Sequence, residues 1–122
     1  MKYSFVRSAF AVSVVALSLA SFSFGGAKDQ TFTGEIMDSQ CANMGSHDVM
    51  MKQEGARDAK QCTMGCVKMG GKYVLFNAQN KSIYQLDDQK KPAQFAGEKV
   101  TVTGKLGNDN KTIHVVSIQA GF

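Results

Sequence analysis

The sequence of 122 residues contains no tryptophan, one proline and three cysteines. It also lacks the local motifs of common hydrolases: no nucleophile elbow indicates a serine hydrolase, and no paired carboxylates indicate a glycosidase. No internal repeat or low-complexity linker occurs, and no dense run of lysine or arginine indicates nucleic-acid binding. These absences predict a small non-enzymatic domain that has no nucleic-acid partner.

The N-terminus of the chain is apolar, but its apolar run is shorter than the ~20 residues that a bilayer span requires. Lys2 and Arg7 are basic, residues 9–19 are apolar apart from serines, and residues 25–27 are small. This order is typical of a secretory signal peptide, so we expect cleavage after Ala27. The mature protein, residues 28–122, is then periplasmic or secreted with no membrane anchor. Without Lys2 and Arg7 its formal charge falls from +4 to +2.

Five short β-strands are predicted in the mature chain, which is one domain. They cover residues 31–38, 72–77, 82–87, 98–106 and 111–120. In the fourth, Val100 and Val102 alternate with threonines, which is the period of a strand with one buried face. Pro92 starts a short helical turn before the last two strands. This order predicts a mainly β fold, namely a small five-stranded OB-like barrel with a short helical excursion between strands 1 and 2. The alternative is a generic antiparallel sheet with a helical flap.

The excursion, residues 38–71, holds every cysteine of the chain. Helix-forming residues predict one or two short helices between residues 48 and 60, and Asp38 is expected to cap the first turn of the excursion. So long a connection in so small a domain usually has a function of its own.

Several stretches of the mature chain resemble a family of small exported bacterial proteins, Acidobacteria-like, that is classed as a domain of unknown function. They are GEIMDSQCA, CTMGCVKMGGKYVL, YQLDDQKKPAQFAGEKVTVTGKL and TIHVVSI. The shared pattern is G-x-I-x-D-S-x-C, then C-T-x-x-C-V-K, then V-x-V-x-G. The resemblance implies export and a single domain, and it brings no established activity.

Cys41, His47, Cys62 and Cys66 form the pattern C-x5-H-x14-C-x3-C. Three thiolates and an imidazole are a complete ligand set for zinc and also suit copper. The i, i+4 spacing of Cys62 and Cys66 would place both thiols on one face of a helical turn. The sequence therefore predicts a copper or zinc site at these four residues, and Met44 or Met50 is a candidate auxiliary ligand for copper.

Two other interpretations of the cysteines stay open. In an exported domain, Cys41 could form a disulfide with Cys62 or Cys66, which leaves one cysteine over. The domain would then be a disulfide-stapled interaction module that binds an unknown protein or small ligand through its barrel face. Thiol redox chemistry at Cys62 and Cys66 is the remaining interpretation, although it normally uses C-x-x-C.

Two features outside the excursion bear on these interpretations. Tyr73, Phe76 and Tyr84 are candidates for an aromatic binding platform on the barrel face. His114 is expected to share a strand face with Val116 and Ile118 and to be a partly buried structural residue.

Overall fold

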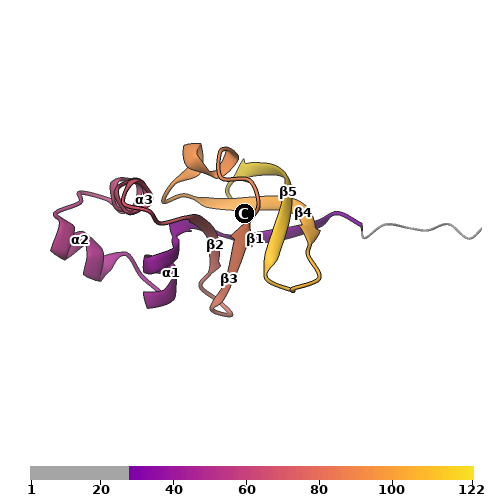
Figure 1. Ribbon diagram of the computed structural model, residues 1–122, viewed down its shortest axis with the longest axis horizontal. Helices are drawn as coiled ribbons and strands as arrows, with labels where there is room; N and C mark the ends of the chain where they lie inside the picture. The colour runs from indigo at the N-terminus through magenta and orange to yellow at the C-terminus, as the bar shows by residue number, and fades with distance from the viewer. Residues whose placement is uncertain (1–27) are drawn as a thin grey trace, which may run out of the picture.

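A computed structural model describes residues 28–122 (Figure 1); the predicted signal peptide lies outside the described residues. The strands are β1 (Gln30–Asp38), β2 (Tyr73–Asn77), β3 (Ser82–Leu86), β4 (Lys99–Leu106) and β5 (Thr112–Ala120). The helices are α1 (Ser39–Met44), α2 (Asp48–Glu54), α3 (Ala59–Lys68) and the 3-10 helix η1 (Lys91–Phe95). Within the described part of the chain, no helix has the length and apolar character needed to cross a membrane.

The strands pair in the order β1-β2-β3-β5-β4, and the sheet closes because β4 also pairs with β1. All neighbours are antiparallel except β3 and β5, which are parallel. The predicted OB-like fold with a helical excursion between the first two strands is confirmed. Each predicted strand boundary lies within one residue of the observed boundary.

The excursion contains three helices, where one or two were expected between residues 48 and 60. Aspartate caps account for the two helices outside that expectation. Asp38 begins α1, since its carboxylate accepts a hydrogen bond of 2.9 Å from the backbone N–H of Gln40. Asp58 begins α3 in the same way, by accepting from the backbone N–H of Gln61 at 2.9 Å.

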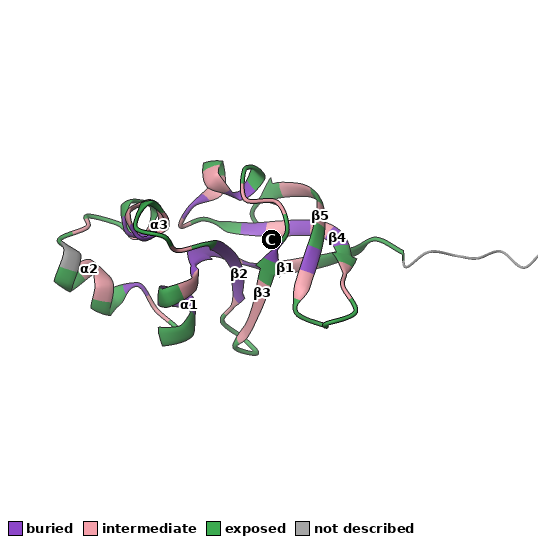
Figure 2. Ribbon diagram, in the orientation of Figure 1, coloured by how far each residue is buried: buried purple, intermediate pink, exposed green. Residues whose placement is uncertain are grey.

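Two hydrophobic cores share the sheet. The first fills the inside of the closed sheet, and the second lies between the outer face of β1 and β2 and the three helices, which gather at one end of the molecule (Figure 1). β2 is therefore buried on both faces, as Figure 2 shows. Tyr73 and Leu75 belong to the inner core, whereas Val74 and Phe76 belong to the core under the helices.

This arrangement separates the predicted aromatic platform. Tyr73 points into the inner core, while Phe76 lies under the excursion. Tyr84 is partly buried, with its ring centroid 5.3 Å from that of Phe32. The three aromatic rings therefore pack in different places and do not share one exposed face.

His114 is exposed, so its predicted partial burial is wrong. The register between β4 and β5 shifts at Thr103 and Gly104, and this leaves Val116 as an extra residue in β5. Because one extra residue reverses the inward and outward alternation, Ile118 packs against the inner core while His114 faces outward. Its Nδ1 lies 3.0 Å from the carboxylate of Asp87.

Candidate metal centre

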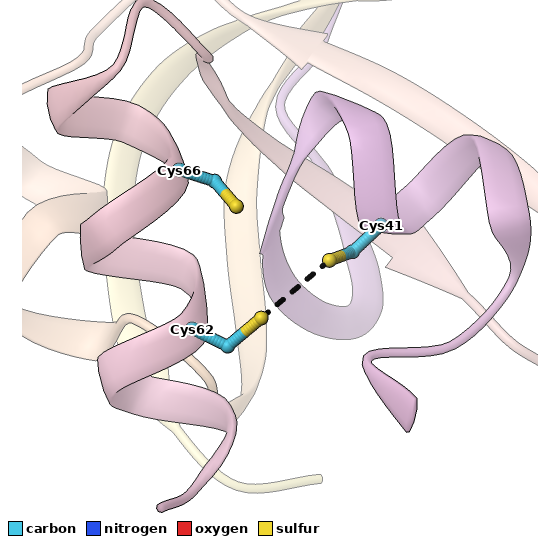
Figure 3. Close-up of side chains that lie close together, drawn as sticks. All are labelled: Cys41, Cys62 and Cys66. Carbon is cyan, nitrogen blue, oxygen red and sulfur yellow. Dashed lines mark hydrogen bonds between the residues drawn. The ribbon is translucent and has the colours of Figure 1, made fainter. Parts of the chain in front are cut away.

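The three cysteines converge in the core under the helices. Cys41 lies on α1, and Cys62 and Cys66 lie one turn apart on the face of α3 that points toward it (Figure 3). Their sulfur atoms all lie within 4.8 Å of one another, and the Sγ atoms of Cys41 and Cys62 are 3.8 Å apart. The predicted placement of Cys62 and Cys66 on one helical face is confirmed.

Local capping explains why α3 presents these two thiols. Asp58 sets the first turn of the helix, and the side chain of Gln61 reaches back to accept a hydrogen bond of 3.2 Å from the backbone N–H of Arg57. This exchange is related to the capping box. At the other end, where α3 ends at Lys68, the N–H of Gly71 donates to the carbonyl of Cys66 at 3.0 Å.

All three thiols are buried. The exposed fractions are 0% for Cys41, 3% for Cys62 and 4% for Cys66. Apolar neighbours surround them: Met37, Ala42, Val74 and Phe76 are buried with them, and Met50, Met51, Ala56 and Ile83 pack at the edge. This environment excludes water on most sides and therefore strengthens any electrostatic interaction inside it.

The pKa of the Cys41 thiol is raised above its usual value. Burial is the largest cause, and a hydrogen bond to the Asp38 carboxylate, together with the charge of that carboxylate, raises the pKa further; Cys62 adds a smaller contribution. Asp38 is itself fully buried while it caps α1. A cation among the sulfurs would favour loss of this proton, because a coordinating thiol is deprotonated by the metal.

The sulfur spacing of Cys41 and Cys62 is that of a thiol–thiol hydrogen bond; it is also compatible with metal ligation, and it is too long for a disulfide bond. Two sulfurs bound to one metal at about 2.3 Å with a tetrahedral angle lie about 3.8 Å apart. The sulfurs of Cys41 and Cys62 are at this distance. A disulfide requires about 2.05 Å, and none of the three cysteines forms one in the structure. Three close cysteines of this kind could hold a metal ion.

The fourth predicted ligand, His47, lies outside the group of converging sulfurs. Its Nε2 is 2.7 Å from a carboxylate oxygen of Glu35, which projects from the outer face of β1. The imidazole is buried, with 8% of the residue exposed, and its Nδ1 has no hydrogen-bond partner among the described residues. The contact with Glu35 ties the segment between α1 and α2 to the sheet, and it leaves the imidazole outside the group of three sulfurs.

The methionines named as auxiliary ligands lie at different places around the centre. Met50 is partly buried and packs against the core that contains the cysteines. Met44 is 46% exposed and lines a different hollow, together with Phe76 and Ile83. Met69, which follows α3, is 67% exposed and lines the hollow next to Cys62 and Cys66. Its spacing of three residues from Cys66 is the sequence signal that it lies on the same side of the helix.

This hollow gives the cysteine centre a contact with the surface. It has a volume of about 330 Å³. Its lining consists of Gly55, Ala56, Gln61, Cys62, Gly65, Cys66 and Met69. Cys41 is not part of the lining, so the centre is open on the α3 side and closed on the α1 side.

Comparison with known proteins returned no match to a family model, to a curated protein or to a solved structure. The resemblance to a family of exported bacterial proteins therefore stays a prediction. The interpretation of the centre rests on its own geometry.

Proposed function

We propose that this protein is an exported metal-binding domain that holds one Cu(I) ion with Cys41, Cys62 and Cys66. The observation that carries the proposal is the convergence of the three buried sulfurs, which come from two different helices. The helical excursion is then the part of the chain that builds the site, and the closed sheet is the support on which it is built.

The ligand set favours Cu(I) over Zn²⁺. Structural zinc sites almost always have four ligands, and the imidazole that would be the fourth lies outside the group of three converging sulfurs. Thiolates and thioethers are soft ligands, which suit Cu(I). Met50 and Met51, which carry thioethers, pack at the edge of the same core.

Export to an oxidising compartment would give the bound metal a physiological role. The N-terminal pattern of residues 1–27 is typical of a secretory signal. In an oxidising compartment, closely spaced thiols are prone to form disulfides. A bound Cu(I) ion would keep the three thiols in place, and the protein would buffer or carry copper there without performing a reaction.

The test is thiol counting combined with native mass spectrometry on the mature protein. We expect one copper ion per chain and three thiols that react with an alkylating reagent only after a Cu(I) chelator has removed the metal. The matched variants are Cys41→Ser, which should lose tight binding, and His47→Gln, which should retain it. Failure of the reduced protein to retain copper would refute the proposal, and so would equal thiol reactivity before and after chelation.

A second candidate function follows from the 3.8 Å separation of Cys41 and Cys62, since this pair would need only a small movement to form a disulfide. The bond would span 21 residues and stabilise the domain by about 3 kcal/mol through the entropy of the unfolded chain. The protein would then be a stapled interaction module, with Cys66 left out of the bridge. Peptide mapping of aerobically purified protein distinguishes the two functions: a Cys41–Cys62 bridge with one alkylatable thiol, whether or not a chelator is present, favours the staple.

A further inference from the structure

The cysteine centre has an open side and a closed side. Cys62 and Cys66 line the hollow of about 330 Å³ beside α3, whereas Cys41 is fully buried and lies behind them. Met69 stands at this hollow with 67% of its surface exposed. Among the described residues that line the hollow, the exposed sulfur is thus that of a thioether, and the more strongly binding thiols lie deeper.

We propose that this hollow is the route by which Cu(I) enters and leaves the centre, and that the thioether of Met69 is its first protein ligand. The proposal rests on the proposed function, because it assumes that the three cysteines bind Cu(I). It adds the direction of approach, an additional ligand and the chemistry of the partner, which must present Cu(I) on soft ligands that can be exchanged at the surface.

The transfer is a sequence of ligand exchanges in which copper remains Cu(I). A bond from copper to the sulfur of Met69 forms as one bond to the donor breaks. Cys66 and Cys62 then bind, each releasing its thiol proton to water, and the remaining donor ligand and Met69 leave. Cys41 binds last and releases its proton, which completes the three-sulfur site. A neutral thioether is a weaker ligand than a thiolate, so each exchange after the first moves the ion toward a stronger set of ligands.

Gly65 makes the route testable. It lies between Cys62 and Cys66 on α3 and lines the hollow, and a Cβ atom built on it would meet nothing within 4 Å. A Cβ atom is therefore accommodated at this position, and a larger side chain would extend from it toward the hollow. Gly65→Leu is the blocking variant. Gly65→Ala is its matched control, since it removes the same glycine from the helix and leaves most of the hollow open.

The first experiment follows loading of the reduced mature protein from the Cu(I) complex of bicinchoninate by stopped-flow absorbance. We expect Gly65→Leu to load at least about tenfold more slowly than Gly65→Ala, because copper must then wait for a local opening of the helical segment. Both variants should still bind one copper ion at equilibrium. Met69→Leu, an exposed replacement of similar volume, should also load more slowly than wild type, whereas Met44→Leu, exposed at a different hollow, should not.

Equal loading rates for Gly65→Leu and Gly65→Ala would overturn the route, and an unchanged rate in Met69→Leu would overturn the part assigned to that residue. A second experiment uses no metal: alkylation of Cys62 and Cys66 by iodoacetamide, mapped by mass spectrometry, should be slower in Gly65→Leu than in Gly65→Ala. Wild-type protein that binds no copper would refute the proposed function and the ligand role of Met69 together. The alkylation rates would still decide whether the hollow is the way to the thiols.

Discussion

Cys41 connects the candidate metal centre to a different helix from the other two cysteines, and this gives metal binding a predictable effect on the free energy of unfolding. Cys62 and Cys66 are four residues apart on α3, so an unfolded chain can still bring them to one metal ion. Cys41 is 21 residues from Cys62, and only the folded excursion holds these two sulfurs 3.8 Å apart. Metal binding through all three sulfurs therefore favours the folded state. Binding through the two sulfurs of α3 alone would favour the folded over the unfolded state much less.

The magnitude follows from ligand linkage. At a free Cu(I) concentration about 100 times the dissociation constant, a ligand that binds only the folded state raises the free energy of unfolding by about 2.7 kcal/mol. For a domain of this size, that corresponds to a rise in Tm of roughly 10–20 °C. We expect this shift in the wild-type protein under reducing conditions. We expect most of it to be lost in Cys41→Ser.

The assay is thermal unfolding followed by circular dichroism, with and without buffered Cu(I), for each protein. Each variant is compared with its own metal-free state, so any direct effect of the serine on stability cancels. Met44→Leu is the control, since its side chain is exposed and lines a different hollow. A copper-induced shift in Cys41→Ser as large as that of the wild-type protein would refute the reasoning, because the metal would then not use the α1 sulfur.

Three further predictions concern parts of the fold that support the centre. His47→Gln should leave copper binding unchanged and lower the free energy of unfolding by about 1 kcal/mol, because it weakens a largely buried hydrogen bond to Glu35. Copper stoichiometry measures the first effect and urea unfolding the second. Loss of copper binding would show that the histidine is a ligand. Gly97→Ala should lower the free energy of unfolding, measured in urea, by about 2–3 kcal/mol. Gly97 has a φ of +75°, and the Cβ of an alanine there would lie 2.5 Å from the backbone at the start of α3. Near-wild-type stability would contradict this packing. The pKa of Asp87 is lowered, first by the hydrogen bond from the backbone N–H of Val115, so its contribution to stability is present above its ordinary pKa of 3.8 and is lost as the pH falls through the lowered pKa. The stability difference between wild type and Asp87→Asn should therefore shrink toward zero as the pH falls through this lowered pKa, and a difference that does not depend on pH would contradict the assignment.

The strands were predictable because each carries its own signal. Alternation in the segment around Val100 and Val102 reflects a sheet with one face turned toward the inner core, and turn residues mark the strand ends. β2 follows a different rule, since all four residues from Tyr73 to Phe76 are buried. A continuous apolar run indicates a strand covered on both faces, and the long excursion supplies the second cover.

The helices of the excursion were less predictable, because their positions depend on single capping residues. Asp38 begins α1 by accepting hydrogen bonds from the backbone N–H groups of Gln40 and Cys41, and Asp58 begins α3 by accepting one from Gln61. A signal carried by one side chain is easily hidden among other polar residues. The sequence indicated that Asp38 would cap the first turn. It did not indicate the start of α3 at Ala59, which determines where Cys62 and Cys66 point.

The site was partly predictable for a similar reason. Spacing along one helix places Cys62 and Cys66 together, and spacing alone cannot decide which distant residue meets them. Cys41 meets them because α1 packs against the same outer face of the sheet. His47 has an equally suitable position in the pattern, but its side chain lies outside the group of three sulfurs and contacts Glu35 on β1. Tertiary packing decides whether a histidine lies next to a cysteine or next to a carboxylate, and the local sequence does not encode that packing.

The central claim is that three sulfurs from two helices form one metal site without the imidazole. X-ray absorption spectroscopy of the reduced, copper-loaded mature protein tests this claim most directly, since it reports the oxidation state and the identity of the bound atoms. The predicted result is one Cu(I) ion with sulfur ligands only, in the wild-type protein and in His47→Gln alike. A nitrogen ligand that disappears in His47→Gln, or a protein that retains no copper, would contradict the account.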